Sequence, residues 1–198
     1  MPPVREKAAL AFFCAASLLA CPAKKDEPRY SVGPVSIAVP PGFVDDMERA
    51  QKLQGDGKVE TQNRVWVNKL AKMQVALSLS RLQHQPEWDK VSTTVLLTEL
   101  VNQELAAGEK SGLKTVDSDR KWVGDFLHYT VEGDLAGKLA TSSHTALWLD
   151  DKGDCWHASA VCTAQPADRP KCGELMKTVQ FAIDAGTPAP APPAPAPK

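Results

Sequence analysis

Alternation of apolar and polar side chains predicts several β-strands along this chain of 198 residues. The clearest case is 73–80, where apolar residues alternate with polar or small ones, as in a strand with one buried face. Less regular alternation predicts six more strands, at 35–39, 62–68, 113–116 with an extension toward 122, 126–132, 139–149 and 155–162. Short segments rich in Gly, Asp and Pro predict turns between strands, at 40–42, 133–134 and 151–154.

Two segments change to the helical period of three to four residues. The first is 87–110, a long amphipathic helix whose end is marked by Gly108 and Gly112. The second is 170–183, which begins with a proline in its first turn. The order of elements predicts an α+β fold, an antiparallel sheet flanked by one long central helix and one C-terminal helix.

The N-terminal segment has the composition of an export signal. Arg5 and Lys7 precede an uncharged run, 8–20, that spans roughly 20 Å as a helix and is too short for a hydrocarbon core of ~30 Å. The run ends in Leu-Leu-Ala-Cys at 18–21, the lipobox pattern of bacterial lipoproteins, and this predicts a lipid on Cys21. The alternative is an ordinary secretory signal in which the cysteine is coincidental.

These features divide the chain into four parts. They are a lipoprotein signal peptide at 1–20, a tether at 21–29, a globular domain at 30–184 and a Pro/Ala-rich tail at 185–198. The expected location is the bacterial cell envelope, outside the cytoplasm. Pro22 follows the cysteine in place of the aspartate that marks inner-membrane retention in some bacteria, which favours the outer membrane.

The charge of the chain argues against nucleic acid as a partner. The formal net charge is −1, and removal of Arg5, Lys7 and Glu6 with the signal takes away one net positive charge, which leaves −2. Proteins that bind nucleic acids usually carry a basic patch or an excess of basic residues. The expected partners are therefore the membrane, through the N-terminal lipid, and another envelope protein.

Three cysteines remain in the domain after export. Cys162 ends a predicted strand and Cys172 opens the last helix, so a helix that packs back on the sheet brings them within disulfide distance. Cys155 and Cys162 lie about 23 Å apart on one extended strand and cannot pair. We expect a Cys162–Cys172 disulfide that stabilises the fold by roughly 2–3 kcal/mol, with Cys155 as a free thiol. The alternative is three free, buried thiols.

Three histidines lie on neighbouring predicted strands. A hairpin centred near Ala136 pairs His128 with His144, so that both imidazoles lie on one face. We expect an odd-length turn to place His157 on the same face and an even-length turn to point it away. Together, His128, His144 and His157 would be a candidate site for zinc or manganese. The alternative is that they are half-exposed surface side chains with no cofactor.

Two phrases of the sequence resemble a known family. The segment 36–43 reads Ser-Ile-Ala-Val-Pro-Pro-Gly-Phe, and 176–181 reads Met-Lys-Thr-Val-Gln-Phe. With a mid-chain helix between two groups of strands, they resemble the PsbP-like superfamily, which is named for an extrinsic photosystem II subunit. The resemblance covers about 30–184 and implies an α/β/α sandwich. It also implies a binding or assembly factor and not an enzyme, and it assigns no site residue.

The sequence therefore leaves three functional hypotheses. The first is a membrane-anchored lipoprotein that binds or assembles with another envelope component without catalysis. The second is a metal-binding protein that uses the strand histidines. The third is a carrier of a small apolar ligand held between sheet and helix.

Overall fold

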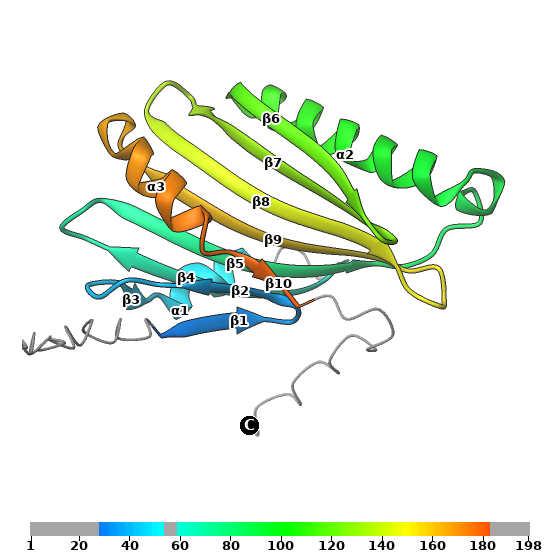
Figure 1. Ribbon diagram of the computed structural model, residues 1–198, viewed down its shortest axis with the longest axis horizontal. Helices are drawn as coiled ribbons and strands as arrows, with labels where there is room; N and C mark the ends of the chain where they lie inside the picture. The colour runs from blue at the N-terminus through cyan, green and yellow to red at the C-terminus, as the bar shows by residue number, and fades with distance from the viewer. Residues whose placement is uncertain (1–27, 54–58, 183–198) are drawn as a thin grey trace, which may run out of the picture.

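The structure is a computed structural model that describes residues 28–53 and 59–182. The predicted signal peptide, Cys21 and the Pro/Ala-rich tail lie outside the described residues, as does all of the predicted tether except Pro28 and Arg29. The predicted α+β class is confirmed, since an antiparallel sheet is flanked by helices (Figure 1).

Seven strands form the large sheet, and every neighbouring pair in it is antiparallel. In spatial order they are β3 (Val44–Asp45), β4 (Glu60–Asn68), β5 (Met73–Leu82), β9 (Cys155–Ala164), β8 (Leu139–Leu149), β7 (Phe126–Leu135) and β6 (Leu113–Val123). A small sheet of three strands lies against one face of it, composed of β1 (Arg29–Val32), β2 (Val35–Ala38) and β10 (Gln180–Phe181).

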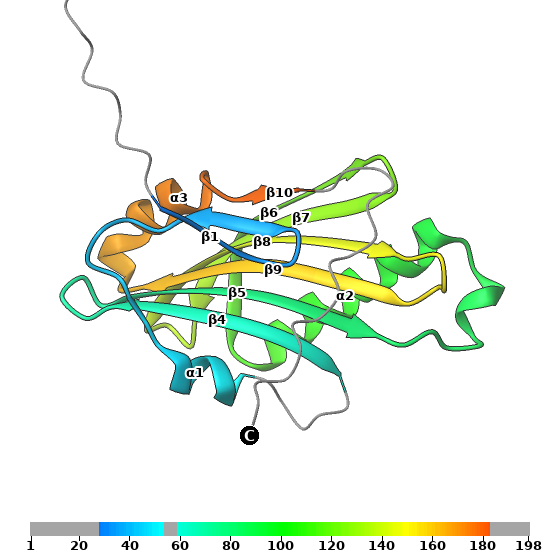
Figure 2. The ribbon, with the colours of Figure 1, turned by 90° about the horizontal axis from the view of Figure 1, so that it is seen from below.

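Helices lie on both faces of the large sheet. The helix α3 (Arg169–Met176) packs beside the small sheet against β8 and β9, on the side that we call the small-sheet face. On the opposite side, the helix face, α2 (Thr93–Lys110) packs on β6 and β8, and α1 (Met47–Lys52) packs on β4. Figure 2 shows β1 and β10 above β4 and β5, with α1 below them. Two short 3₁₀ turns, η1 (Trp88–Lys90) and η2 (Pro166–Asp168), precede α2 and α3.

The strand β5 shows how alternation in sequence becomes a two-sided sheet. Its buried and half-buried residues alternate along the strand. Val75, Leu77 and Leu79 are at most 2% exposed and belong to the core between the large sheet and the small one. A second core lies under α2, where Leu97 and Val101 contact the strands of the other half of the sheet.

The edge strands of the large sheet are protected against pairing with another chain. β3 has two residues, and β6 carries a β-bulge between Thr115 and Asp117. Charged side chains also follow along β6, at Asp117, Asp119, Arg120 and Lys121. Short, bulged or charged edges disfavour the addition of a further strand.

The prediction of a C-terminal helix over 170–183 is wrong beyond its first half. α3 ends at Met176, and the chain then forms β10. Thr178 explains the change, since its hydroxyl donates to the Leu175 carbonyl (2.8 Å) and accepts from the Ala38 amide (3.2 Å). These bonds hold the chain against β2, where Phe181 pairs with Val35.

Several boundaries also differ from the sequence-based expectation. β1 begins at Arg29, which was assigned to the tether, and the polar segment after 44 contains α1. The turn between β7 and β8 lies at 136–138 and not at 133–134, with Ala136 and Gly137 both at positive φ (50° and 65°). Positive φ at both central positions is typical of tight hairpin turns.

Candidate functional site

Cys162 and Cys172 form a disulfide in the structure, with a Cα–Cα distance of 5.6 Å. Both residues are fully buried, and the bond joins the end of β9 to α3. Cys155 is a free, buried thiol at the start of β9. Burial raises its pKa to about 12, so at neutral pH it is protonated and a poor nucleophile.

The structure brings His128 and His144 to the small-sheet face but does not place them opposite each other. The β7–β8 hairpin is centred on Gly137, one residue later than expected, so His128 pairs with Ala146 and His144 with Thr130. Burial lowers the pKa of both histidines. The negative charge of Glu132 opposes this at His144, and the positive charge of Lys121 lowers the pKa of both. The His128 ring lies edge-on to Phe181, with 5.2 Å between centroids.

His157 lies on the helix face, so the expected site of three histidines on one face is wrong. Leu149 pairs with Cys155 across a five-residue turn, and an odd turn pairs residues of equal parity. His144 and His157 differ in parity and therefore point to opposite faces, contrary to the rule that we applied to the sequence. Within 28–53 and 59–182, no cluster of three His, Cys, Asp or Glu side chains could hold a metal ion.

A row of polar residues crosses the helix face, one from each of six neighbouring strands. Each member pairs directly with the next across the sheet. We call this set the polar row: Asn63 (β4), Ser78 (β5), Ser159 (β9), Thr145 (β8), Tyr129 (β7) and Arg120 (β6). Sequence analysis missed it because the row exists only across strands, although each strand alternates in a way that could have suggested it.

Glu104 of α2 sits over the polar row beside His157 and Tyr129. Its Oε2 atom is 3.1 Å from His157 Nε2, but that nitrogen and the Tyr129 hydroxyl are buried without a well-aligned hydrogen bond. Burial acts to raise the pKa of Glu104, but the hydrogen-bonding and charge of His157, with Tyr129, hold it below its ordinary value. Burial and the negative charge of Glu104 raise the pKa of Tyr129. In this cluster α2 covers Tyr129 and most of His157, whereas the Glu104 side chain is 47% exposed.

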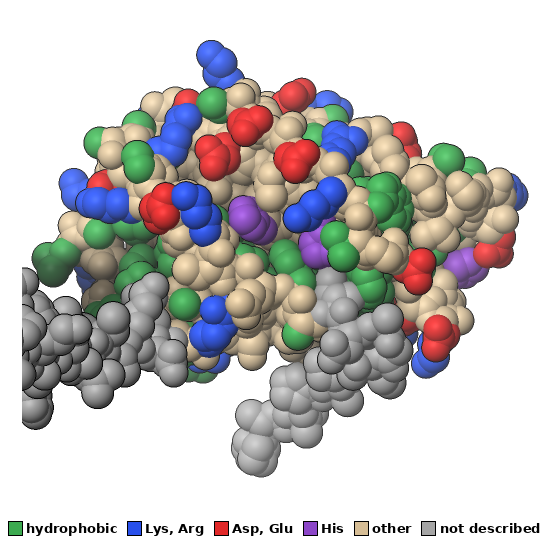
Figure 3. Space-filling view, viewed as in Figure 1, with side chains coloured by type: hydrophobic (Ala, Val, Ile, Leu, Met, Phe, Trp, Pro, Cys, Tyr) green, Lys and Arg blue, Asp and Glu red, His purple; other side chains and the backbone are tan. Residues whose placement is uncertain are grey.

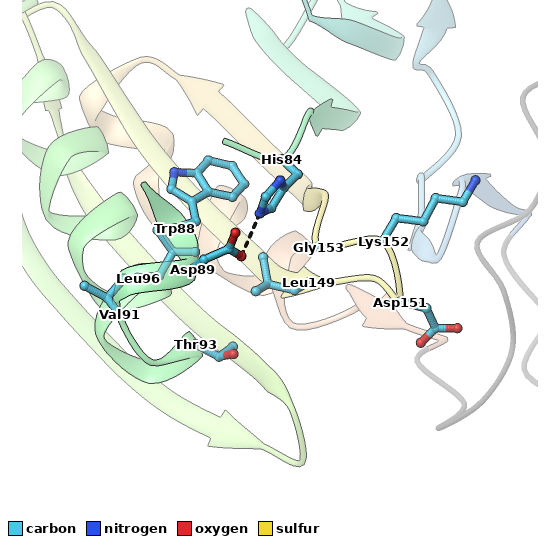
Figure 4. A pocket seen from close by; sticks show the side chains of 10 residues that line it. All are labelled: His84, Trp88, Asp89, Val91, Thr93, Leu96, Leu149, Asp151, Lys152 and Gly153. Atoms are coloured by element: carbon cyan, nitrogen blue, oxygen red, sulfur yellow. Dashed lines mark hydrogen bonds and ion pairs between the residues drawn. The ribbon is translucent and has the colours of Figure 1, made fainter. Parts of the chain in front are cut away.

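A pocket of about 410 Å³ lies at the end of the molecule where α2 begins (Figure 4). Its volume is within the range of small-molecule sites, roughly 300–1,000 Å³. Apolar side chains in its lining are Trp88, Val91, Leu96 and Leu149, and polar or charged ones are His84, Asp89, Thr93, Asp151 and Lys152. His84 Nε2 and Asp89 Oδ1 are 3.0 Å apart, as the dashed line in Figure 4 marks.

The β8–β9 turn gives the pocket a rigid rim. Asp154, whose side chain is 9% exposed, accepts hydrogen bonds from Arg81 Nε (2.9 Å) and the His84 amide (2.7 Å). These hydrogen bonds hold the pKa of Asp154 below its ordinary value. Asp150 accepts from the amides of Lys152 (2.9 Å) and Asp154 (3.0 Å), which fixes the turn. Turn chemistry at 151–154 was predicted, but the pocket was not, because η1 and the turn are far apart in sequence.

The two candidate surfaces differ in what they can do chemically. The pocket is open and has a tryptophan, aliphatic side chains and both signs of charge, a combination suited to binding. The cluster at Glu104 has its imidazole and phenol largely buried under α2 and exposes only the carboxylate. Basic and acidic side chains are intermixed over the face seen in Figure 3, which agrees with the near-neutral composition.

Comparison with known proteins gives similarity at the level of fold. No protein-family model and no curated protein matches the chain. A cyanobacterial PsbP from Synechocystis sp. PCC 6803 is 10% identical, with 83% of this chain and 98% of that chain covered and a TM-score of 0.46. LpqN, described as involved in cell envelope biogenesis of Mycobacterium tuberculosis, is 14% identical over 77% of this chain and 85% of that one (TM-score 0.48). The Saccharomyces cerevisiae Ran-binding protein Mog1p is 13% identical over 79% and 96% (TM-score 0.41).

Similarity at such low sequence identity describes only the general architecture and says nothing about binding partners. PsbP, whose superfamily the sequence resembles, is among the proteins of similar architecture. Among residues 28–53 and 59–182, the structure has no helix that combines the length and the apolar character needed to cross a bilayer.

Proposed function

We propose that this protein is a lipid-anchored binding protein of the bacterial cell envelope and that it acts without catalysis. The pocket beside Trp88 is the observation that carries the proposal, since its lining combines apolar and charged side chains next to a turn fixed by hydrogen bonds. Its proposed occupant is a side chain or short segment of another envelope protein. The disulfide supports a location outside the cytoplasm, because such bonds persist in oxidising compartments.

Carriage of a small apolar ligand between α2 and the sheet is less well supported. Leu97, Val101 and Leu127 fill that interface and are at most 2% exposed. The pocket lies at the start of α2 and has charged side chains in its lining. A wholly apolar ligand would leave those groups without compensation for the water they lose.

Lipid attachment can be tested by replacing Cys21. The Cys21→Ala variant should leave the membrane fraction and lose the mass of its acyl chains. Cys14→Ala is the matched control, because Cys14 lies in the segment expected to be removed, and it should stay with the membrane. If Cys21→Ala remains in the membrane fraction to the same extent as the unmodified chain, the proposed anchor is wrong.

Binding at the pocket can be tested by crosslinking in intact cells. A photo-crosslinking amino acid replaces Val91, which lines the pocket and is 45% exposed, and in a control chain it replaces Val116 of β6, which is 56% exposed. We expect a discrete product from position 91 alone, lost in Trp88→Ala and in Lys152→Glu chains that melt normally. Equal products from both positions, or none from position 91, would contradict the proposal.

A further inference from the structure

The end of the domain opposite the pocket carries a fully exposed leucine between two lysines. In the β4–β5 turn, Leu70 is 98% exposed, and Lys69 and Lys72 beside it are exposed. The turn is fixed, because the Asn68 side chain accepts from the Ala71 amide (2.9 Å) and Lys72 adopts φ 50°. A single exposed leucine is ordinary in a soluble protein, so its surroundings decide whether it has a role.

More apolar surface lies beside this turn. Val44 of β3 pairs with Val67 of β4, three residues before Leu70, and Val44 is 69% exposed. Met47, at the start of α1, is 70% exposed. The uncharged Pro-Pro-Gly loop at 40–42 reaches the same place, since a Cβ added to Gly42 would lie 3.2 Å from the Asn68 amide nitrogen. Apolar side chains are visible at this left-hand end in Figure 3.

The charges at this end favour an anionic partner. Its acidic groups are paired with basic neighbours: Asp45 with Arg64 (2.8 Å), Asp46 with Arg49 (3.3 Å) and Glu48 with Lys52 (2.6 Å). Lys69 and Lys72, by contrast, have no ion-pair partner within the described part of the chain. The balance is therefore a positive charge around exposed apolar side chains, which suits the headgroups and acyl boundary of an anionic bilayer.

The N-terminal entry to the domain is at the same end. Val39 donates from its amide to the Pro28 carbonyl (3.3 Å), so the start of β1 lies directly beside the 40–42 loop. Figures 1 and 2 both show the start of β1, the β2–β3 loop and the β4–β5 turn at the left, and the β8–β9 turn at the right. Eight residues from Cys21 to Arg29 reach at most about 30 Å. A lipid on Cys21 would hold this end near the bilayer.

We propose that the end formed by Leu70, Val44 and Met47, with Lys69 and Lys72, is a second membrane contact that docks on an anionic bilayer. This proposal rests on the proposed lipid anchor. In the docked orientation, the pocket beside Trp88 faces away from the membrane. The lipid alone would keep this end within reach of the surface without fixing its contact with the bilayer. The second contact selects one orientation, in which the pocket is presented to a partner outside the bilayer.

The test measures the depth of two positions in the full chain, reconstituted into vesicles with brominated acyl chains. An environment-sensitive fluorophore is attached at Leu70→Cys or, as a control at the opposite end, at Lys152→Cys. Cys155 is buried and Cys162 and Cys172 are bonded, so in a chain that has lost Cys14 with its signal and carries a lipid on Cys21 the added thiol is the reactive one. We expect quenching at position 70 and none at position 152, and stronger quenching with phosphatidylglycerol than with phosphatidylcholine.

Three single variants and one control assign the contact to its side chains. Removing the leucine in Leu70→Ser should lower the docked population about tenfold. Lys69→Gln and Lys72→Gln should each lower it about fivefold on phosphatidylglycerol, at about 1 kcal/mol per charge. The double substitution Lys90→Gln/Lys152→Gln at the pocket end should leave it unchanged.

The outcomes separate this proposal from the proposed anchor. An intact mass with acyl chains, together with equal quenching at positions 70 and 152 or none at either, overturns the second contact and leaves the anchor in place. A mass without acyl chains overturns the anchor. The same comparison is then made with Cys21→Ser, and the second contact stands only if position 70 alone is quenched.

Discussion

The two faces of the seven-stranded sheet differ in chemistry, because neighbouring residues of one strand point to opposite faces. On β5, Leu77 points to the small-sheet face and is fully buried, while its neighbour Ser78 belongs to the polar row on the helix face. The small-sheet face packs Val75, Leu77 and Leu79 against the small sheet and α3. The helix face has apolar packing under α2 and polar side chains across its centre.

This difference predicts how single substitutions act on stability. The small-sheet face joins strands from the start, middle and end of the chain, and the disulfide closes the same layer. Burial of apolar surface there, and in the second core under α2, is the main favourable term in folding. Ser78, a half-buried member of the polar row, buries little apolar surface, so we expect it to tolerate substitution better than its neighbour Leu77.

The largest expected effect comes from Leu77→Ala. Removing a fully buried leucine leaves a cavity in the core, and the free energy of unfolding should fall by about 3 kcal/mol. Ser78→Ala is the matched control one residue away, and it should change stability by less than about 0.5 kcal/mol. Denaturant unfolding of both variants measures the contrast. Similar losses from both would show that the polar row carries as much of the fold as the core does.

Loss of the disulfide should have the second-largest effect. The bond closes a sequence separation of 10 residues, and Cys162→Ala with Cys172→Ala should lower stability by about 2–3 kcal/mol. Cys155→Ala, on the helix-face side, is the comparison variant, and it should leave the effect of a reductant on the melting temperature unchanged. A chain whose melting temperature is insensitive to reductant would show that the disulfide does not form in solution.

The elements of this fold were easier to predict from sequence than the relation between them. Strict alternation on β5 predicts its position, because that strand has one buried face along most of its length. The register between strands depends on turn geometry, and a shift of one residue at the β7–β8 turn moved the partner of His128 by two. The polar row and the pocket both depend on such long-range pairing.

Local hydrogen bonds also overrode a pattern that looked helical. Leu175 and Met176 do lie on the buried side of α3, but Thr178 stops the helix and the chain pairs with β2. Periodicity alone could not predict where α3 ends, because Ala38, whose amide donates to the Thr178 hydroxyl, is far away in the sequence.

A smaller effect, the dependence of stability on pH, should also distinguish the two faces. Burial lowers the pKa of His128 and His144 on the small-sheet face below the ordinary 6.5, so the unfolded chain takes up protons there before the folded chain does. Stability should therefore fall as the pH drops below about 6.5. The His128→Gln/His144→Gln chain should lose less stability over this range than the unmodified chain. An unchanged slope in the double variant would contradict the assignment.

The smallest effect is expected from Glu104→Gln on the helix face. The Glu104 side chain is 47% exposed, so its pairing with His157 should contribute only about 0.5 kcal/mol at neutral pH. Because His157 and Tyr129 hold its folded pKa below the ordinary 4.5, this contribution is present above pH 4.5 and is lost as the pH falls through the folded value. The variant and the unmodified chain should thus converge in acid, in a pH range below the one in which the histidines act. Glu99→Gln, on an exposed part of the same helix, should show no such convergence. A difference that persists in acid would mean that Glu104 contributes by packing and not by charge.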